Sequence, residues 1–192
     1  MSEREIAREV RALRKSGGEG AYQKTVLKNG IRIVSETIPY VRSVSLGVWA
    51  NVGSRDEGPQ QNGLSHFIEH MVFKGTKRRS VKEIAQSLES LGGYLNAFTT
   101  KEQTCFYARV LDTHVSQAMD VLADIVQNAT FKEDELEKER QVVIEELKNV
   151  EDDPEDIIHD YFEKALFPSH SLGFPILGTE ANLRRFKRED LR

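Results

Sequence analysis

Two histidines and a glutamate stand within one short run, His66-Phe67-Ile68-Glu69-His70. On an α-helix, residues four apart lie about 40° apart around the axis and about 6 Å apart along it, so both imidazoles can reach one metal ion. Glu69 lies roughly 60° from His66 and roughly 100° from His70, close enough to face a water on that metal without being a ligand. The pattern therefore predicts a metal site with a carboxylate beside the metal-bound water.

The helix that carries this motif is predicted to bury its other face. Apolar residues recur at helical spacing and form one stripe that must pack inward. They are Leu64, Phe67, Ile68, Met71 and Val72. The two histidines and the glutamate fall on the opposite face, where we expect a cleft or solvent. The alternative is an ordinary solvated face that holds these three side chains without a metal.

A catalytic zinc site usually has three protein ligands and a water, so one more ligand must come from elsewhere in the chain. Glutamates of a long charged helix predicted at residues 131–150 are the best candidates. Glu139 and Glu146 are nearly eclipsed and flank the buried stripe of that helix by about 60–80°. Carboxylates at the margin of a buried face are costly unless a positive charge meets them, which a zinc ion would supply. An ordinary charged flank, with Lys138 and Arg140 nearby, is the alternative.

The other histidines and the single cysteine are weaker candidates. His114, His159 and His170 have no acidic partner in a supporting pattern, and we expect structural or solvent-facing roles for them. One cysteine, Cys105, excludes an internal disulfide and a multi-cysteine zinc site. Its apolar surroundings predict a buried position on a strand.

The amino-acid composition argues against two classes of protein, nucleic-acid binders and membrane-spanning proteins. The 192 residues carry 27 Lys and Arg against 31 Asp and Glu, whereas a nucleic-acid binder usually shows a basic surplus or stripe. The short basic run at residues 77–79 is interpreted as a solvated loop. No apolar stretch approaches the ~18 residues that a membrane-spanning helix needs. The missing secretory signal and the lone cysteine favour a cytoplasmic location, with neither a membrane nor a nucleic acid as partner.

The predicted elements run in the order strands, helices, strands and helices. We expect strands at residues 22–27, 31–36, 43–52, 94–99 and 104–111, and helices at about 64–72, 81–91, 112–128, 131–150 and 154–166. Residues 1–20 are interpreted as a poorly ordered N-terminal arm, and residues 21–192 as one domain. This order predicts an α+β fold, with helices packed on one face of a largely antiparallel sheet.

Turn and capping residues set several of these boundaries. Asn29-Gly30 is a common tight-turn pair and joins the first two strands into a hairpin. Ser80 and Glu83 form a capping box at the start of the second helix. Asp112 is expected to cap the helix that follows the last strand.

These residues resemble the pitrilysin or insulinase family of zinc peptidases, whose motif is the inverted H-x-x-E-H. Within that family, the sequence is similar to the bacterial relatives of the mitochondrial processing peptidase β subunit. The resemblance runs from about Thr25 to the last residue. Residues 63–66 and 71–76 look like the surroundings of the family motif, 92–99 like its substrate-binding edge strand, and 139–146 like the segment with the third ligand.

The resemblance implies a role for each candidate residue. His66, His70 and Glu146 would be the ligands of Zn²⁺, and Glu69 would be the general base. Glu139 would be a further catalytic-site carboxylate that supports the ligands without binding the metal itself. The function implied is that of a zinc metalloendopeptidase.

The resemblance also implies a substrate and a partner. An extended or unfolded peptide would lie as an added strand along Asn96, Ala97, Phe98 and Thr99. Family members usually carry two similar α/β domains, or pair two subunits, and this chain covers roughly the first half. A second homologous domain or subunit is therefore an expected partner, and a second copy of this chain is another.

Two other functions stay open at this point. The first is a non-catalytic scaffold or partner subunit on the same fold, which the complete motif argues against. The second is a structural zinc domain, which usually has four ligands rich in cysteine. A metal assay separates the first from a peptidase.

Overall fold

The computed structural model describes residues 22–192, so the arm expected at residues 1–20 lies outside the described part of the chain. The chain separates into two compact units, one ending at Arg42 and the other comprising Ser43–Arg192. No helix within the described residues has both the length and the apolar character needed to cross a bilayer.

The first unit contains the predicted hairpin. β1 (Gln23–Val26) and β2 (Arg32–Ser35) pair antiparallel, each a little shorter than the sequence indicated. Gly30 has a φ of 90°, a left-handed conformation that suits glycine because it has no Cβ. The hairpin around Asn29-Gly30 is therefore confirmed.

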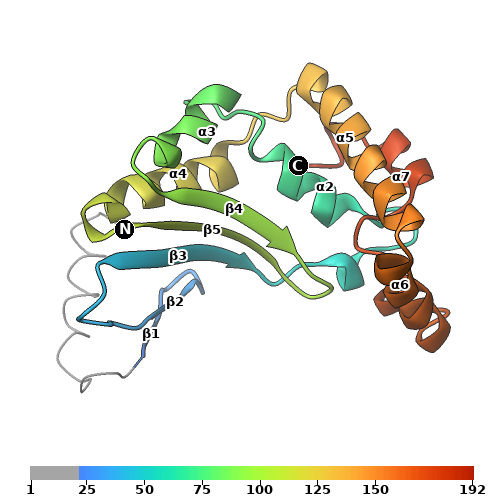
Figure 1. The fold of residues 1–192 in the computed structure, drawn as a ribbon, viewed down its shortest axis with the longest axis horizontal. Coiled ribbons are helices and arrows are strands. Elements are labelled where there is room, and N and C mark those ends of the chain that lie inside the picture. Colours follow the sequence, from blue (N-terminus) through green and yellow to red (C-terminus); the bar gives the residue numbers. More distant parts are fainter. Residues whose placement is uncertain (1–21) are drawn as a thin grey trace. The chain divides into compact units, whose positions relative to one another are not determined.

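The second unit is built on an antiparallel sheet of three strands (Figure 1). They are β3 (Ser43–Ala50), β4 (Tyr94–Thr99) and β5 (Thr104–Leu111). The order is β3-β5-β4, so β5 is central, and within the described residues β4 pairs with β5 alone. One side of β4 is consequently free to pair with another strand.

Three helices lie on one side of this sheet in Figure 1, as the sequence predicted. They are α2 (Leu64–Met71), α3 (Val81–Glu89) and α4 (Val115–Asn128). Their apolar stripes and the covered face of the sheet form one core. Its buried residues are Val72, Ile84, Leu88, Ala97, Phe106, Ala108, Val110, Ala118, Val121, Leu122 and Ile125.

A second core joins α2 to the C-terminal helices. These are α5 (Glu133–Asp152) and α7 (Glu180–Arg185), whereas α6 (Pro154–Leu166), between them in the chain, contributes no buried residue. The buried residues are Phe67, Met71, Leu136, Val143, Ile144, Leu147, Leu183, Phe186 and Leu191. Ile68 of α2 packs against both cores, so the motif helix lies between the sheet and α5.

Short 3₁₀ turns connect several elements, and one of them changes a predicted helix start. They are η1 (Ser54–Asp56), η2 (Asp112–His114) and η3 (Ser171–Gly173). The prediction that Asp112 caps α4 is wrong, because Asp112 lies in η2, accepts from the amide of Thr113, and α4 begins only at Val115. Likewise α5 begins after Phe131, whose φ of 46° is incompatible with a right-handed helix.

The capping box of α3 has the predicted form. The Ser80 hydroxyl accepts from the amide of Glu83 at 3.3 Å, and the Glu83 carboxylate accepts from the amide of Ser80 at 2.8 Å. Two otherwise unpaired amides at the start of the helix are thereby satisfied, which fixes where α3 begins.

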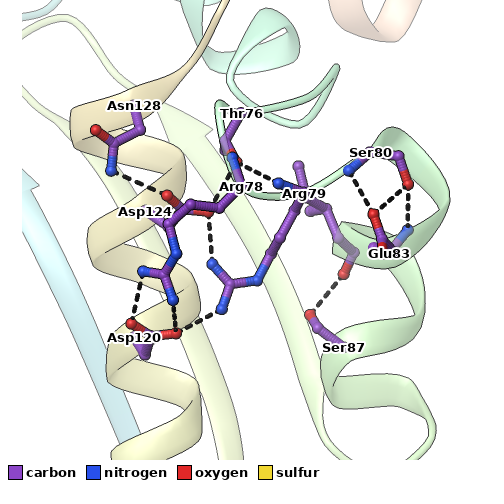
Figure 2. Close-up of polar contacts among 10 residues, drawn as sticks. Thr76, Arg78, Arg79, Ser80, Glu83, Ser87, Asp120, Asp124 and Asn128 are labelled. Carbon is purple, nitrogen blue, oxygen red and sulfur yellow. Dashed lines mark hydrogen bonds and ion pairs between the residues drawn. The ribbon is translucent and has the colours of Figure 1, made fainter.

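The basic run at residues 77–79 is only partly the solvated loop that the sequence suggested (Figure 2). Lys77 is exposed, but Arg78 donates two hydrogen bonds to Asp120 of α4, at 2.9 and 3.0 Å. Arg79 is mostly buried and pairs with both Asp120 and the buried Asp124. The two arginines form ion pairs with acidic residues of α4, so this basic run attaches the loop after α2 to α4.

Candidate metal centre

The N-terminus of α2 is fixed by a buried glutamate. One carboxylate oxygen of Glu57 accepts from the amide of Gly63 at 2.8 Å, and the other accepts from the amide of Ser65 at 2.6 Å. A carboxylate is favourable at the positive end of a helix. Glu57 was not among the residues predicted from the sequence. Its signal was the lack of a capping side chain at Gly63, which leaves those amides in need of an acceptor from elsewhere.

Three of the predicted residues converge from α2 and α5. Nε2 of His66 lies 3.8 Å from one carboxylate oxygen of Glu146, and Nε2 of His70 lies 3.4 Å from the other. One ligand atom from each residue lies within 4.8 Å of the others. Donors of one tetrahedral zinc ion lie about 3.3 Å apart, given Zn–ligand distances of about 2.0–2.1 Å. Two imidazoles and a carboxylate at these distances fit a zinc ion.

Of the two surroundings that the helical wheel left open for His66, a cleft or solvent, open solvent is excluded by its burial. His66 is only 7% exposed, and α5, which packs against α2, brings a carboxylate oxygen of Glu146 to 3.8 Å from its Nε2. Burial, together with the nearby His70 and against the attraction of Glu146, lowers the pKa of His66 to about 4. Its imidazole is therefore neutral at pH 7, the form that binds a metal. Its Nδ1 is buried without a hydrogen-bond partner among the described residues.

His70 lies between two carboxylates of α5. Its Nδ1 is 2.9 Å from Oε1 of Glu139, a side chain that is 5% exposed. Burial works to lower the pKa of His70, but the hydrogen bonds to Glu139 and Glu146 outweigh it and raise the pKa to about 9. The carboxylates thus favour a positive charge at this point, which either a proton on His70 or a divalent cation can provide.

Glu69 stands beside these residues and touches the edge strand. Its Oε2 accepts a hydrogen bond of 2.6 Å from the hydroxyl of Thr99, at the end of β4. Burial raises the pKa of Glu69, while the Thr99 hydroxyl and His70 partly oppose the rise. A half-buried carboxylate with a raised pKa is a better proton acceptor than an exposed one.

The four residues expected to bind substrate follow the free edge of the sheet. Asn96 and Phe98 are exposed on one face of β4, whereas Ala97 is buried on the other. Thr99 reaches the candidate site through Glu69. The geometry therefore brings one of the four into the site and leaves the other three along the adjoining strand.

A lysine that the sequence analysis did not single out completes the cluster. Nζ of Lys74 lies 2.5 Å from Oε2 of Glu139. Together with His70, it lowers the pKa of Glu139 in spite of that side chain's burial. No local sequence pattern predicts this contact, because Lys74 follows α2 and Glu139 belongs to α5, far apart along the chain.

The weaker candidates lie elsewhere. Among the described residues, the one group of at least three side chains able to hold a metal is His66, His70 and Glu146. His159 and His170 are exposed, and a ring nitrogen of His170 accepts from the amide of Leu172. Cys105 is buried in β5, as predicted.

Comparison with known proteins is consistent with this geometry. The model of the insulinase family (peptidase family M16) matches residues 32–180. An uncharacterised zinc protease of Bacillus subtilis, YmxG, is 56% identical over 165 residues, which are 86% of this chain and 40% of that protein. A probable mitochondrial-processing peptidase β subunit of Arabidopsis thaliana is 44% identical over 167 residues, 87% of this chain and 32% of that protein.

A solved structure has a similar fold. The crystal structure of a protease from Helicobacter pylori superposes with a TM-score of 0.85 at 25% identity, covering 91% of this chain and 42% of that one. The chain thus spans 40% of the Bacillus subtilis protein, 32% of the Arabidopsis thaliana protein and 42% of the Helicobacter pylori chain.

Proposed function

The chain belongs to the insulinase family of peptidases, peptidase family M16, and we propose that it forms the metal-binding part of a zinc metalloendopeptidase. One observation carries this proposal: His66, His70 and Glu146 converge beside a half-buried Glu69. A structural zinc site would have four protein ligands, whereas this cluster has three and leaves a coordination position for water.

Each residue then has a distinct task. Bound to His66, His70 and Glu146, Zn²⁺ would lower the pKa of its water towards ~7 and polarise the scissile carbonyl. Glu69 takes the proton from the attacking water and delivers it to the leaving amine. Glu139 accepts from Nδ1 of His70 and so keeps Nε2 of that ring directed at the metal.

The substrate that fits best is an extended segment of an unfolded protein or peptide. Such a segment would add as a strand to the free edge of β4, along Asn96–Thr99, through main-chain hydrogen bonds. Thr99 links this edge to the base, since its hydroxyl donates to Glu69. A segment bound along β4 would therefore lie next to the proposed base where it passes Thr99.

The rest of the substrate chamber is proposed to come from a second homologous domain or subunit. The chain spans about 40% of the length of its relatives, which leaves room for such a domain in the whole protein. A second copy of this chain is the other source of a facing wall. A cytoplasmic location stays a prediction.

The variant Glu69→Gln of the full-length protein tests the base. The amide keeps the size of the side chain but accepts no proton, so we expect zinc to be retained and peptide cleavage to fall by roughly 10²–10⁴-fold. Zinc is measured by elemental analysis, and cleavage with an unstructured fluorogenic peptide.

The matched control is Glu145→Gln, an exposed carboxylate of α5 next to the proposed ligand Glu146. It is expected to cleave at the wild-type rate. Cleavage by Glu69→Gln at that same rate would remove Glu69 as the base. A wild-type protein that neither binds zinc nor cleaves would instead support a non-catalytic partner on the same fold.

A further inference from the structure

We infer that Lys74 is a positioning residue of the zinc site, which acts through Glu139 on the imidazole of His70. The inference rests on the proposed function, because it concerns the geometry of the proposed ligand His70. Lys74 touches neither the three ligand side chains nor the proposed base in any described contact, so its role is to hold Glu139 in place.

The carboxylate of Glu139 has one partner for each oxygen. Oε2 lies 2.5 Å from Nζ of Lys74, and Oε1 lies 2.9 Å from Nδ1 of His70. Because Glu139 is buried, water does not readily replace either partner. Removal of the ammonium group would leave Oε2 unpaired and free the carboxylate to turn away from His70.

The charges around Glu139 also support a positioning role for Lys74. Glu69, Glu139 and Glu146 bring three carboxylates to the same region as the two histidines. Lys74 supplies a positive charge on the far side of Glu139, away from His70. The carboxylate can then remain charged in its buried position, as an acceptor for the ring N–H of a metal-bound His70.

The loop that carries Lys74 is anchored firmly enough for such a task. The carbonyl of Gly75 accepts from both the amide and the hydroxyl of Thr130, at 3.0 and 3.1 Å. Figure 2 shows that the hydroxyl of Thr76 and the guanidinium of Arg79 both reach Asp124 on α4. Lys74 therefore extends toward α5 from a backbone that is attached to α4.

The experiment compares three variants of the full-length protein. Lys74→Met removes the charge but keeps the length of the side chain, Lys74→Arg keeps the charge, and Lys77→Met removes a charge from an exposed position on the same loop. Zinc affinity is measured by competition with a chromogenic chelator, and kcat and KM are measured at saturating zinc. Thermal unfolding of the zinc-free proteins monitors the fold.

Supports of a metal-bound histidine typically contribute about 10–100-fold in metal affinity or activity. We expect Lys74→Met to weaken zinc binding about 10-fold and to lower kcat with little change in KM. Lys74→Arg should recover most of the affinity, and Lys77→Met should match the wild type. Adding Lys74→Met to Glu139→Gln should cost nothing further, because the lysine acts through that carboxylate.

Unchanged zinc affinity and kcat in Lys74→Met would overturn the inference while leaving the proposed function intact. So would a loss that persists in full when Glu139 is already glutamine. A loss of thermal stability that accounts for the whole effect, without recovery in Lys74→Arg, would assign the lysine to folding alone. A wild-type protein without zinc would overturn the proposed function itself.

Discussion

By itself, the burial of the His66 side chain is unfavourable for the stability of the fold. The side chain is buried, its Nδ1 has no partner among the described residues, and burial lowers its pKa to about 4. Unsatisfied buried polar groups are rare in native proteins and call for a functional explanation. A neutral imidazole whose Nε2 faces a carboxylate is what a cation site requires, and at pH 7 His66 needs no deprotonation before it binds.

Replacement of this histidine is expected to abolish the metal site. His66→Ala should weaken zinc binding by more than ~100-fold, since loss of a ligand costs at least as much as loss of a group that supports one. Zinc content after dialysis, measured by elemental analysis, checks the result. His159→Ala, which changes an exposed histidine on α6, should keep the wild-type zinc content. Equal zinc in both variants would contradict the assignment of His66.

The sequence allowed the histidine pair to be predicted because two residues four apart on a helix are a local pattern. The convergence of Glu146 with that pair needed both its position on the helical wheel and the family resemblance. Glu57 and Lys74 could not be found in this way, because each acts on a residue brought close only by the tertiary fold. For the same reason, the sequence could not decide between a cleft and solvent for His66, which is buried.

At the scale of elements, α2 is held at both ends. Glu57 accepts from amides at its N-terminus, and the loop after its C-terminus is attached to α4 through Thr76, Arg79 and Asp124. A helix of eight residues has little stability of its own, so these attachments determine where its two histidines lie.

The attachment to α4 should be measurable as stability. Asp124 is 1% exposed, and its carboxylate accepts from Thr76, Arg79 and Asn128. We expect Asp124→Asn to lower the free energy of unfolding by about 1–3 kcal/mol at pH 7, because the amide weakens these hydrogen bonds and leaves Arg79 partly unpaired. Urea unfolding monitored by circular dichroism gives the value.

This contribution has a defined pH dependence. Hydrogen bonds from Arg78 and Arg79 lower the pKa of Asp120 to about 2, and bonds from Thr76 and Arg79 lower that of Asp124 despite its burial. Carboxylates with lowered pKa values stabilise the fold above their unfolded value of about 3.9, and lose that effect as the pH falls from there through the lowered pKa of the folded state. The difference between wild type and Asp124→Asn should therefore narrow over this range. The exposed Asp134→Asn should stay within about 0.5 kcal/mol of wild type at pH 7.

Local signals also explain which element boundaries were predictable. The capping box of Ser80 and Glu83 is encoded within four residues, and α3 begins there. The starts of α4 and α5 depend instead on η2 and on the positive φ of Phe131, a ring that packs against both cores. Tertiary packing, absent from a one-dimensional pattern, decides such boundaries.

At the scale of the whole molecule, metal binding and substrate binding make different demands. All three proposed ligands come from α2 and α5, within one compact unit. The proposed substrate edge is a single strand, β4, and a peptide added there would remain open to water on its other side. Efficient hydrolysis needs a substrate held in a defined geometry, and a misplacement of about 1 Å can cost 10²-fold.

These demands can be separated by comparing residues 1–192 alone with the full-length protein. We expect the two to bind zinc with affinities within about 10-fold of each other, since the ligands are shared. We expect kcat/KM of the shorter protein to be lower by roughly 10²-fold or more, because it lacks the facing wall that we propose for the chamber. Zinc affinity is measured by chelator competition, and kcat/KM by cleavage of the same fluorogenic peptide. Addition of the remaining segment as a separate chain should restore cleavage.

Two outcomes would contradict this prediction. Equal kcat/KM in the two proteins would show that the edge of β4 positions a peptide without a second domain. Zinc binding by the full-length protein alone would mean that the metal site itself depends on that domain.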